Sequence, residues 1–185
     1  VRLLSEAWRE GSTCGFGPGA RRAPGASPSP PPPPSGAMDG GTKRIAVEQA
    51  VAVDPERCFD MWLSEVWIGG LGQGPIPPTI LKEGDAATGA GNIRRVGFCI
   101  QEEILEAKRG EFSEYRIKSG PFPVSYHRGR VTFQAAEGGG TLVTWAVSIT
   151  PLRCTELLNE LIIKGVFRSM LRSLAASAAA KAKVS

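Results

Sequence analysis

The only histidine of the chain, His127, lies in the segment SYHRGRVTF, beside Tyr126 and close to Arg128 and Arg130. Histidine and tyrosine can transfer protons, and arginine binds carboxylates and phosphates. The segment is typical of a β-strand, in which successive side chains point to opposite faces. His127 shares a face with Val131, so both arginines are predicted to lie on the opposite face. The sequence therefore predicts no catalytic cluster of His127 with Arg128 and Arg130.

The same alternation in neighbouring segments brings further polar side chains to the face of His127. This inward polar set is Asn92, Arg94, Glu102, Ser113, Tyr115 and His127. A buried charge is costly unless it is paired. Because Arg94 and Glu102 fall on consecutive predicted strands, one interpretation is a structural ion pair between them.

A second interpretation gives these residues a ligand. Arg94 and Tyr115 would grip a carboxylate, an enolate or a phenol oxygen through hydrogen bonds. In a catalytic version, Arg94 would stabilise developing enolate charge, and His127 or Tyr115 would transfer protons. A β-bulge near Gly129 would turn His127 outward and remove its role. Arg94, Tyr115 and His127 are thus the candidate catalytic residues, and both interpretations stay open.

Apolar side chains on the same face, together with Ile162 and Val166 of the predicted C-terminal helix, are predicted to form the wall of a binding site. The predicted ligand-binding set combines them with the polar residues: Asn92, Arg94, Phe98, Glu102, Tyr115, His127, Phe133, Trp145, Ile162 and Val166.

The elements that position these residues follow from the hydrophobic period. KRIAVEQAVAVD alternates as a strand, and Asp54 followed by Pro55 predicts the start of a short helix. Residues 63–78 are rich in glycine and proline yet apolar, which indicates a lid or entrance loop, a second short helix packed on the sheet, or both. Six segments from TILKEG to GTLVTWAVSIT then predict antiparallel strands with short turns.

Beyond Pro151 the period becomes that of one long helix. Gly165 lies in its middle, where glycine costs about 1 kcal/mol relative to alanine, so a close approach of another element or a bend is expected there. The predicted apolar stripe is Leu157, Leu158, Leu161, Ile162, Val166, Met170, Leu171 and Leu174. An antiparallel sheet of this size must bury one face, and this helix is large enough to cover it. The prediction is an α+β fold, a curved seven-stranded antiparallel sheet around the C-terminal helix, with short helices after the first strand and an apolar space between sheet and helix.

The order and spacing of DPERCFDMW, GAGNIRRV, EEI, YRI, YHRGRVTF and GGTLVTW resemble the helix-grip superfamily over about residues 43–175. This superfamily includes the START lipid-transfer domains, the major pollen allergens and the polyketide cyclase/dehydrase group, to which the chain is most similar. The resemblance implies a hydrophobic cavity that takes lipids, sterols, polyketides or hormone-like molecules. It does not settle whether the cavity is catalytic, because fold alone does not determine function.

Composition divides the chain. Residues 1–42 contain the run SPSPPPPPSG and little apolar surface, so we predict a disordered segment, followed by a ligand-binding domain over 43–180 and a frayed tail over 181–185. The proline run is a linker or a ligand for an aromatic groove. The first methionine is Met38, and residues 1–37 are open to interpretation as a translated leader, a targeting segment or a gene-model artefact.

The remaining composition argues against several functions. The net charge of +4 is dispersed, which disfavours nucleic acid as a partner. The four cysteines are far apart and there is one histidine, so no metal site is expected, no cofactor is implied, and free thiols in a reducing compartment, cytoplasmic or plastid, fit best. No apolar run is long enough to span a membrane. We expect a monomer.

Three functions are compatible with these features. The first is binding or transport of a small hydrophobic ligand, such as a lipid, a sterol or a polyketide-like molecule. The second is a cyclase or dehydratase-type lyase that uses pocket Arg, Tyr and His residues. The third is a regulatory module in which a ligand-gated loop over 66–78 meets a partner protein. The sequence favours the first.

Overall fold

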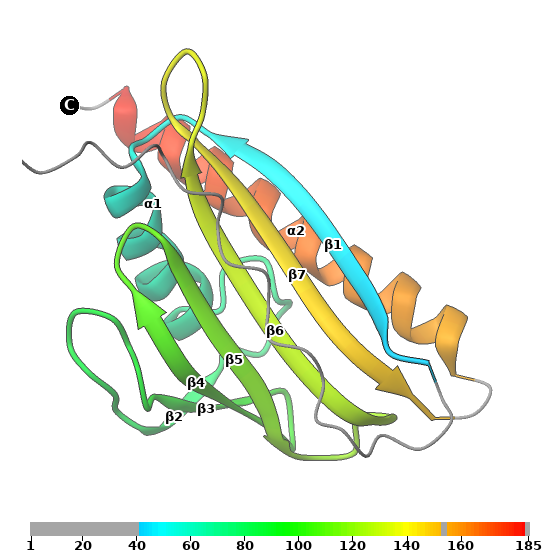
Figure 1. Ribbon diagram of the computed structural model, residues 1–185. Coiled ribbons are helices and arrows are strands. Elements are labelled where there is room, and N and C mark those ends of the chain that lie inside the picture. The colour runs from blue at the N-terminus through cyan, green and yellow to red at the C-terminus, as the bar shows by residue number, and fades with distance from the viewer. Residues whose placement is uncertain (1–40, 153–154, 184–185) are drawn as a thin grey trace, which may run out of the picture. The chain divides into compact units, whose positions relative to one another are not determined.

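The computed structural model describes residues 41–152 and 155–183, and within them a single antiparallel sheet flanked by helices. The sheet order is β1-β7-β6-β5-β4-β3-β2, so each strand from β2 to β7 pairs with the next, and β1 closes the far edge beside β7. In chain order the elements are β1 (Lys43–Val51), α1 (Pro55–Met61), the π-helix η1 (Trp62–Ile68), β2 (Thr79–Lys82), β3 (Ile93–Val96), β4 (Ile100–Lys108), β5 (Phe112–Ser119), β6 (Val124–Ala135), β7 (Thr141–Pro151) and α2 (Glu156–Ala182). The predicted α+β helix-grip fold is confirmed (Figure 1).

The predicted domain boundaries stay a prediction. The segment expected to be disordered, 1–42, lies outside the described residues apart from 41 and 42. The observed elements begin at Lys43, and α2 continues through Ala182, two residues into the predicted frayed tail. Cys14 and Cys154 also lie outside the described residues, whereas Cys58 and Cys99 are free thiols.

The short helices arise from local signals. The Asp54 carboxylate accepts a hydrogen bond from the backbone N–H of Arg57 at 2.9 Å, and Pro55 occupies the first turn of α1. The chain then continues as η1 over part of the segment expected to be a lid or a second helix. Trp62, Val66 and Trp67 of η1 are fully buried, so this part packs as a helix. The following residues, 69–78, form a loop.

The helix α2 covers the sheet along β1 and β7, as Figure 1 shows. Its buried face consists of Ile163, Phe167, Met170, Leu171, Leu174 and Ala178. The predicted stripe is therefore wrong at Leu157 and Leu161, which are 77% and 71% exposed, whereas the side chain of Leu158 lies outside the described part of the structure. Apolar residues occur on more than one face of α2, so the sequence does not show which face is buried. The packing of α2 on the sheet selects one of them.

The reason expected for Gly165 is also wrong in part. A Cβ at Gly165 would have no neighbouring atom within 4 Å, so no element approaches it. The close approach to α2 occurs at Gly72 of the 69–78 loop, where a Cβ would lie 2.8 Å from the Cα of Met170. Gly72 has a φ of 77°, which favours glycine independently. Gly72 thus brings the loop against the middle of the helix.

The core between the sheet and the short helices is aromatic. The rings of Phe59 and Phe133 lie 5.4 Å apart, edge to face, and those of Trp62 and Trp145 lie 6.1 Å apart. Trp145 also stacks on Phe167 of α2, at 4.5 Å between ring centroids. Such pairs add to the stabilisation from buried area. This packing fills the space under α1 and η1, and the space beyond Trp145 is a cavity.

Candidate functional site

A cavity of about 200 Å³ lies between the sheet and the middle of α2. The floor comes from β3 to β7, one side from α2, and the remainder from the 69–78 loop and the β5–β6 turn. The lining residues are Gln73, Arg94, Val96, Ile100, Glu102, Tyr115, Ile117, Phe122, His127, Trp145, Ile162, Ile163, Val166, Phe167 and Met170. Seven of the ten residues of the predicted ligand-binding set line it, namely Arg94, Glu102, Tyr115, His127, Trp145, Ile162 and Val166.

Arg94 and Glu102 form an ion pair at the cavity wall. They lie directly opposite each other in the register of β3 and β4. Nε and Nη2 of Arg94 lie 2.8 and 2.7 Å from the same carboxylate oxygen, Oε2, of Glu102. Only 3% of the Arg94 side chain and 14% of the Glu102 side chain are exposed. Pairing on neighbouring strands is what permits both charges to be buried.

Arg94 also holds the end of η1. Its Nη1 donates to the carbonyl oxygens of Val66 at 3.2 Å and Trp67 at 2.5 Å, and its guanidinium stacks 3.8 Å from the Trp67 ring centroid. The last carbonyls of a helix lack hydrogen-bond donors within the helix, and the Arg94 guanidinium donates to two of them here. All three nitrogens of Arg94 are therefore engaged by protein acceptors, which is the structural role considered from the sequence.

Tyr115 is buried against β6. Its hydroxyl oxygen accepts a hydrogen bond from Nε1 of Trp145 at 2.9 Å. It stands opposite Gly129, where a Cβ would lie 2.2 Å from two carbons of the Tyr115 ring. The glycine in the middle of β6 thus makes room for this ring, and the register of β6 with β7 is continuous through it. Burial, with the nearby Glu102 carboxylate, raises the pKa of the Tyr115 phenol well above its ordinary value.

His127 points to the cavity side, next to Tyr115, with 5.5 Å between the ring centroids. The backbone N–H of Ile117 donates to its Nδ1 at 3.3 Å, which places the proton of the neutral imidazole on Nε2. Burial lowers the pKa of His127 to about 4, against an opposing effect of the Glu102 carboxylate. His127 is therefore neutral at physiological pH, and Nε2 is a hydrogen-bond donor.

His127 also adjoins a second hollow of about 180 Å³ near the β5–β6 turn. The backbone pairs of β5 and β6 run from Phe112–Thr132 to Tyr115–Gly129. Beyond these pairs, the imidazole of His127 in β6 accepts the hydrogen bond from the backbone N–H of Ile117 in β5. His127, Ile117 and Phe122 line both the cavity and this hollow. They are the side chains that separate the two spaces.

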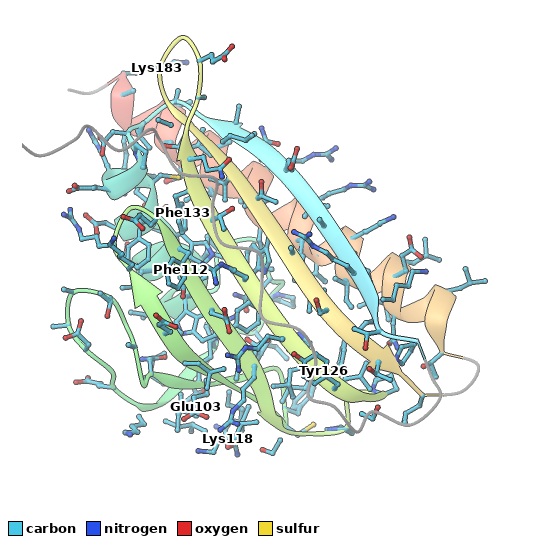
Figure 2. All side chains as sticks on the ribbon, in the orientation of Figure 1. Glu103, Phe112, Lys118, Tyr126, Phe133 and Lys183 are labelled. Carbon is cyan, nitrogen blue, oxygen red and sulfur yellow. The ribbon has the colours of Figure 1, made fainter. Side chains whose placement is uncertain are left out.

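Three residues of the predicted set lie elsewhere. Asn92 is buried and its Oδ1 accepts from Nε1 of Trp67 at 2.8 Å, so it serves the core. Phe133 packs on Phe59 beside α1 (Figure 2). Phe98 is 87% exposed, because β3 ends at Val96 and the alternation of a strand no longer applies in the turn that follows.

The predicted inward residue Ser113 of β5 is fully buried but does not line the cavity. Its Oγ has no hydrogen-bond partner among the described residues.

The two arginines beside His127 lie on the opposite face of the sheet, as their alternation predicts. Arg128 and Arg130 both pair with Glu114, and Arg130 Nη1 lies 3.0 Å from Glu114 Oε2. The guanidinium of Arg130 also lies 3.9 Å from the ring centroid of Phe112. This cluster is separate from the cavity.

The sequence reasoning missed part of the lining. Gln73 lies in a loop, where no period predicts orientation, and Phe122 lies in the β5–β6 turn. Ile163, Phe167 and Met170 come from the helix face that α2 turns to the sheet. The helical spacing of the apolar residues 163, 167, 170 and 174 could have indicated this face. A second apolar stripe through Leu157 and Leu161 was equally compatible with the sequence.

The described residues contain no group of three or more His, Cys, Asp or Glu side chains that could hold a metal ion. None of the described helices is long and apolar enough to cross a membrane. Burial raises the pKa of the Cys58 thiol to about 12, so this cysteine is unreactive at neutral pH.

Comparison with known proteins supports the fold and identifies the family. A norcoclaurine synthase point mutant of Thalictrum flavum, in complex with a transition-state analogue, is 15% identical, with a TM-score of 0.59 over 76% of this chain and 96% of that one. The crystal structure of Ara h 8.0201 is 13% identical, with a TM-score of 0.57 over 76% of this chain and 99% of that one. A Thermobifida fusca protein solved by NMR is 22% identical, with a TM-score of 0.59 over 74% and 92%. At these identities the likeness shows the fold alone.

No curated protein matches the chain in sequence. The sequence profile described as "Polyketide cyclase / dehydrase and lipid transport" matches residues 42–182, which is most of the chain and nearly all of its described part. This protein therefore belongs to the polyketide cyclase/dehydrase and lipid transport family.

Proposed function

We propose that this protein binds a small, mostly apolar ligand in the cavity between the sheet and α2. The observation that carries the proposal is the cavity itself, in which aliphatic and aromatic side chains surround a few polar groups. Concave apolar sites with a small number of polar groups are typical of ligand-binding sites. Membership of a family described by both cyclase activity and lipid transport is consistent with this function.

The volume favours a small ligand. An apolar cavity of about 150 Å³ accommodates benzene, whereas sites for drug-sized ligands range from roughly 300 to 1,000 Å³. The cavity of about 200 Å³ therefore fits a compound of one or two rings better than a sterol or a diacyl lipid. A larger ligand would require the 69–78 loop, which packs on α2 through Gly72, to move outward.

The enzymatic alternative has less support from the geometry. Arg94 is engaged by Glu102 and by two η1 carbonyls, so its guanidinium would have to give up protein partners to stabilise an enolate. His127, with a pKa near 4, is a weak base, and efficient proton transfer at neutral pH favours groups with a pKa near the working pH. These observations support a binding protein over a cyclase or dehydratase.

The test is native mass spectrometry of the full chain after expression in a eukaryotic host. Val166 lines the cavity and is partly exposed, so Val166→Trp can fill the space without opening the core. Leu161→Trp, on the exposed face of the same helix, is the matched control. We expect a bound small molecule in the unmodified protein and in Leu161→Trp, and its loss in Val166→Trp. Equal retention in Val166→Trp would place the ligand outside the cavity and contradict the proposal.

A further inference from the structure

The cavity combines two hydrogen-bond donors with no free positive charge. The Tyr115 oxygen accepts from Trp145, so its hydroxyl hydrogen stays available, and no described residue accepts it. His127 Nδ1 accepts from Ile117, so Nε2–H is available as well. The two rings are neighbours at 5.5 Å between centroids. An oxygen atom of a ligand that reaches this end of the cavity would therefore meet two neutral donors.

The hydrogen-bond acceptors that line the cavity belong to Glu102 and Gln73. Both contacts from Arg94 go to Oε2 of Glu102, and Oε1 has no hydrogen bond among the described residues. Gln73 donates from Nε2 to the carbonyl of Val66 at 2.8 Å, and its Oε1 is buried without a partner among the described residues. The cavity wall thus contains two oxygen atoms that receive no hydrogen bond from the described residues, an anionic one on Glu102 and a neutral, buried one on Gln73.

The single cation in the lining, Arg94, is compensated at short range by Glu102. A ligand carboxylate would therefore add a third, unpaired charge to a buried site and would face the free oxygens of Glu102 and Gln73. Burying an unpaired charge is far more costly than burying a carbonyl or a hydroxyl group that receives hydrogen bonds. The electrostatics thus oppose the sequence-based alternative in which Arg94 grips a carboxylate.

We infer that the cavity selects neutral ligands that carry a carbonyl or hydroxyl oxygen at their buried end, bound by Tyr115 and His127, and that it excludes carboxylates because Glu102 neutralises Arg94. The inference rests on the proposed binding function and specifies its ligand class. It makes Glu102 the residue that determines charge selectivity, through Arg94.

The test compares three naphthalene probes of nearly equal shape with the full chain at neutral pH. These are 2-acetonaphthone, which is neutral with a carbonyl, 2-naphthoate, which is anionic, and unsubstituted naphthalene, which has no polar atom. Dissociation constants come from calorimetry or from NMR titration. We expect 2-acetonaphthone to bind about tenfold or more tightly than 2-naphthoate, and more tightly than naphthalene.

Two substitutions at neighbouring positions of β4 sharpen the test. Glu102→Gln leaves Arg94 uncompensated, so we expect 2-naphthoate to bind at least about tenfold more tightly than to the unmodified protein. Glu103→Gln is the matched control, because Glu103 pairs with Arg116 on the other face of the sheet, and Figure 2 shows its side chain near that of Lys118. It should leave all three dissociation constants unchanged.

Each outcome decides between the two proposals. If none of the probes binds, the proposed binding function fails for compounds of this size. If 2-naphthoate binds to the unmodified protein as tightly as 2-acetonaphthone, binding stands and charge selectivity is wrong. If Glu102→Gln gains no affinity for 2-naphthoate, Arg94 is not the charge that Glu102 neutralises. Should Glu102→Gln fail to fold, the comparison of probes on the unmodified protein still decides the inference.

Discussion

The pH dependence of stability should report the burial of His127. It is the only histidine of the chain, and its folded-state pKa is lowered to about 4. In the unfolded chain its pKa is about 6.5. Between these values the unfolded state binds more protons than the folded state, so stability decreases as the pH falls below about 6.5 and this loss is complete below about pH 4.

The magnitude follows from the two pKa values. Each pKa unit of difference corresponds to about 1.4 kcal/mol, and the fraction of the shift expressed at about pH 5 gives a loss of about 2 kcal/mol relative to pH 7.5. Glu160, whose pKa is lowered to about 2 by Lys164 and Lys43, loses its contribution mainly at lower pH. The window between about pH 7.5 and pH 5 therefore belongs mainly to His127.

The assay is urea denaturation of the full chain at both pH values, with NMR titration of the imidazole. His127→Asn is the control, because its amide oxygen can accept the N–H of Ile117 and cannot be protonated. We expect this variant to be less stable at both pH values and nearly independent of pH between them. The reasoning would be refuted if His127→Asn lost as much stability between pH 7.5 and pH 5 as the unmodified protein does. It would also be refuted if the imidazole of the folded protein titrated near pH 6.5.

Two further predictions concern packing. Gly129→Ala should destabilise the protein by about 1–3 kcal/mol, because its Cβ would overlap the Tyr115 ring. Gly165→Ala has open space around its Cβ and should stabilise α2 by up to about 1 kcal/mol. Thermal denaturation of both variants checks these opposite signs, and two changes of the same sign would contradict the roles assigned to the two glycines. Asn92→Ala should cost about 1–3 kcal/mol by leaving Nε1 of Trp67 unpaired, and a loss below about 0.5 kcal/mol in urea denaturation would show that the buried hydrogen bond contributes little.

The sequence was most informative where a local period acts alone. Successive side chains of a strand alternate for stereochemical reasons, so the common face of Arg94, Glu102, Tyr115 and His127 could be predicted without tertiary information. The same argument placed Arg128 on the opposite face. The argument failed at Phe98, because a turn begins at Gly97 and alternation ends with the strand.

The helix α2 shows the limit of periodicity. Leu161 and Phe167 both belong to apolar stripes of the helix, and only one stripe can face the sheet. Hydrophobic residues recur on more than one side of α2, so its rotation about its own axis follows from docking against β1, β7 and η1. Ser177, for example, donates to the carboxylate of Glu65 in η1 at 2.6 Å, a contact across 112 positions of sequence.

The sequence by itself determined the element order, the antiparallel sheet and the face to which each strand residue points, because these depend on local stereochemistry and hydrophobic pattern. Tertiary structure alone decided which inward residues meet at the cavity and what state they are in. Only the tertiary structure shows that Arg94 binds the last carbonyls of η1, that His127 is a neutral hydrogen-bond donor, and that Gln73 lines the cavity. Hydrogen-bond partners and pKa values depend on atoms distant in sequence, and no local pattern encodes them.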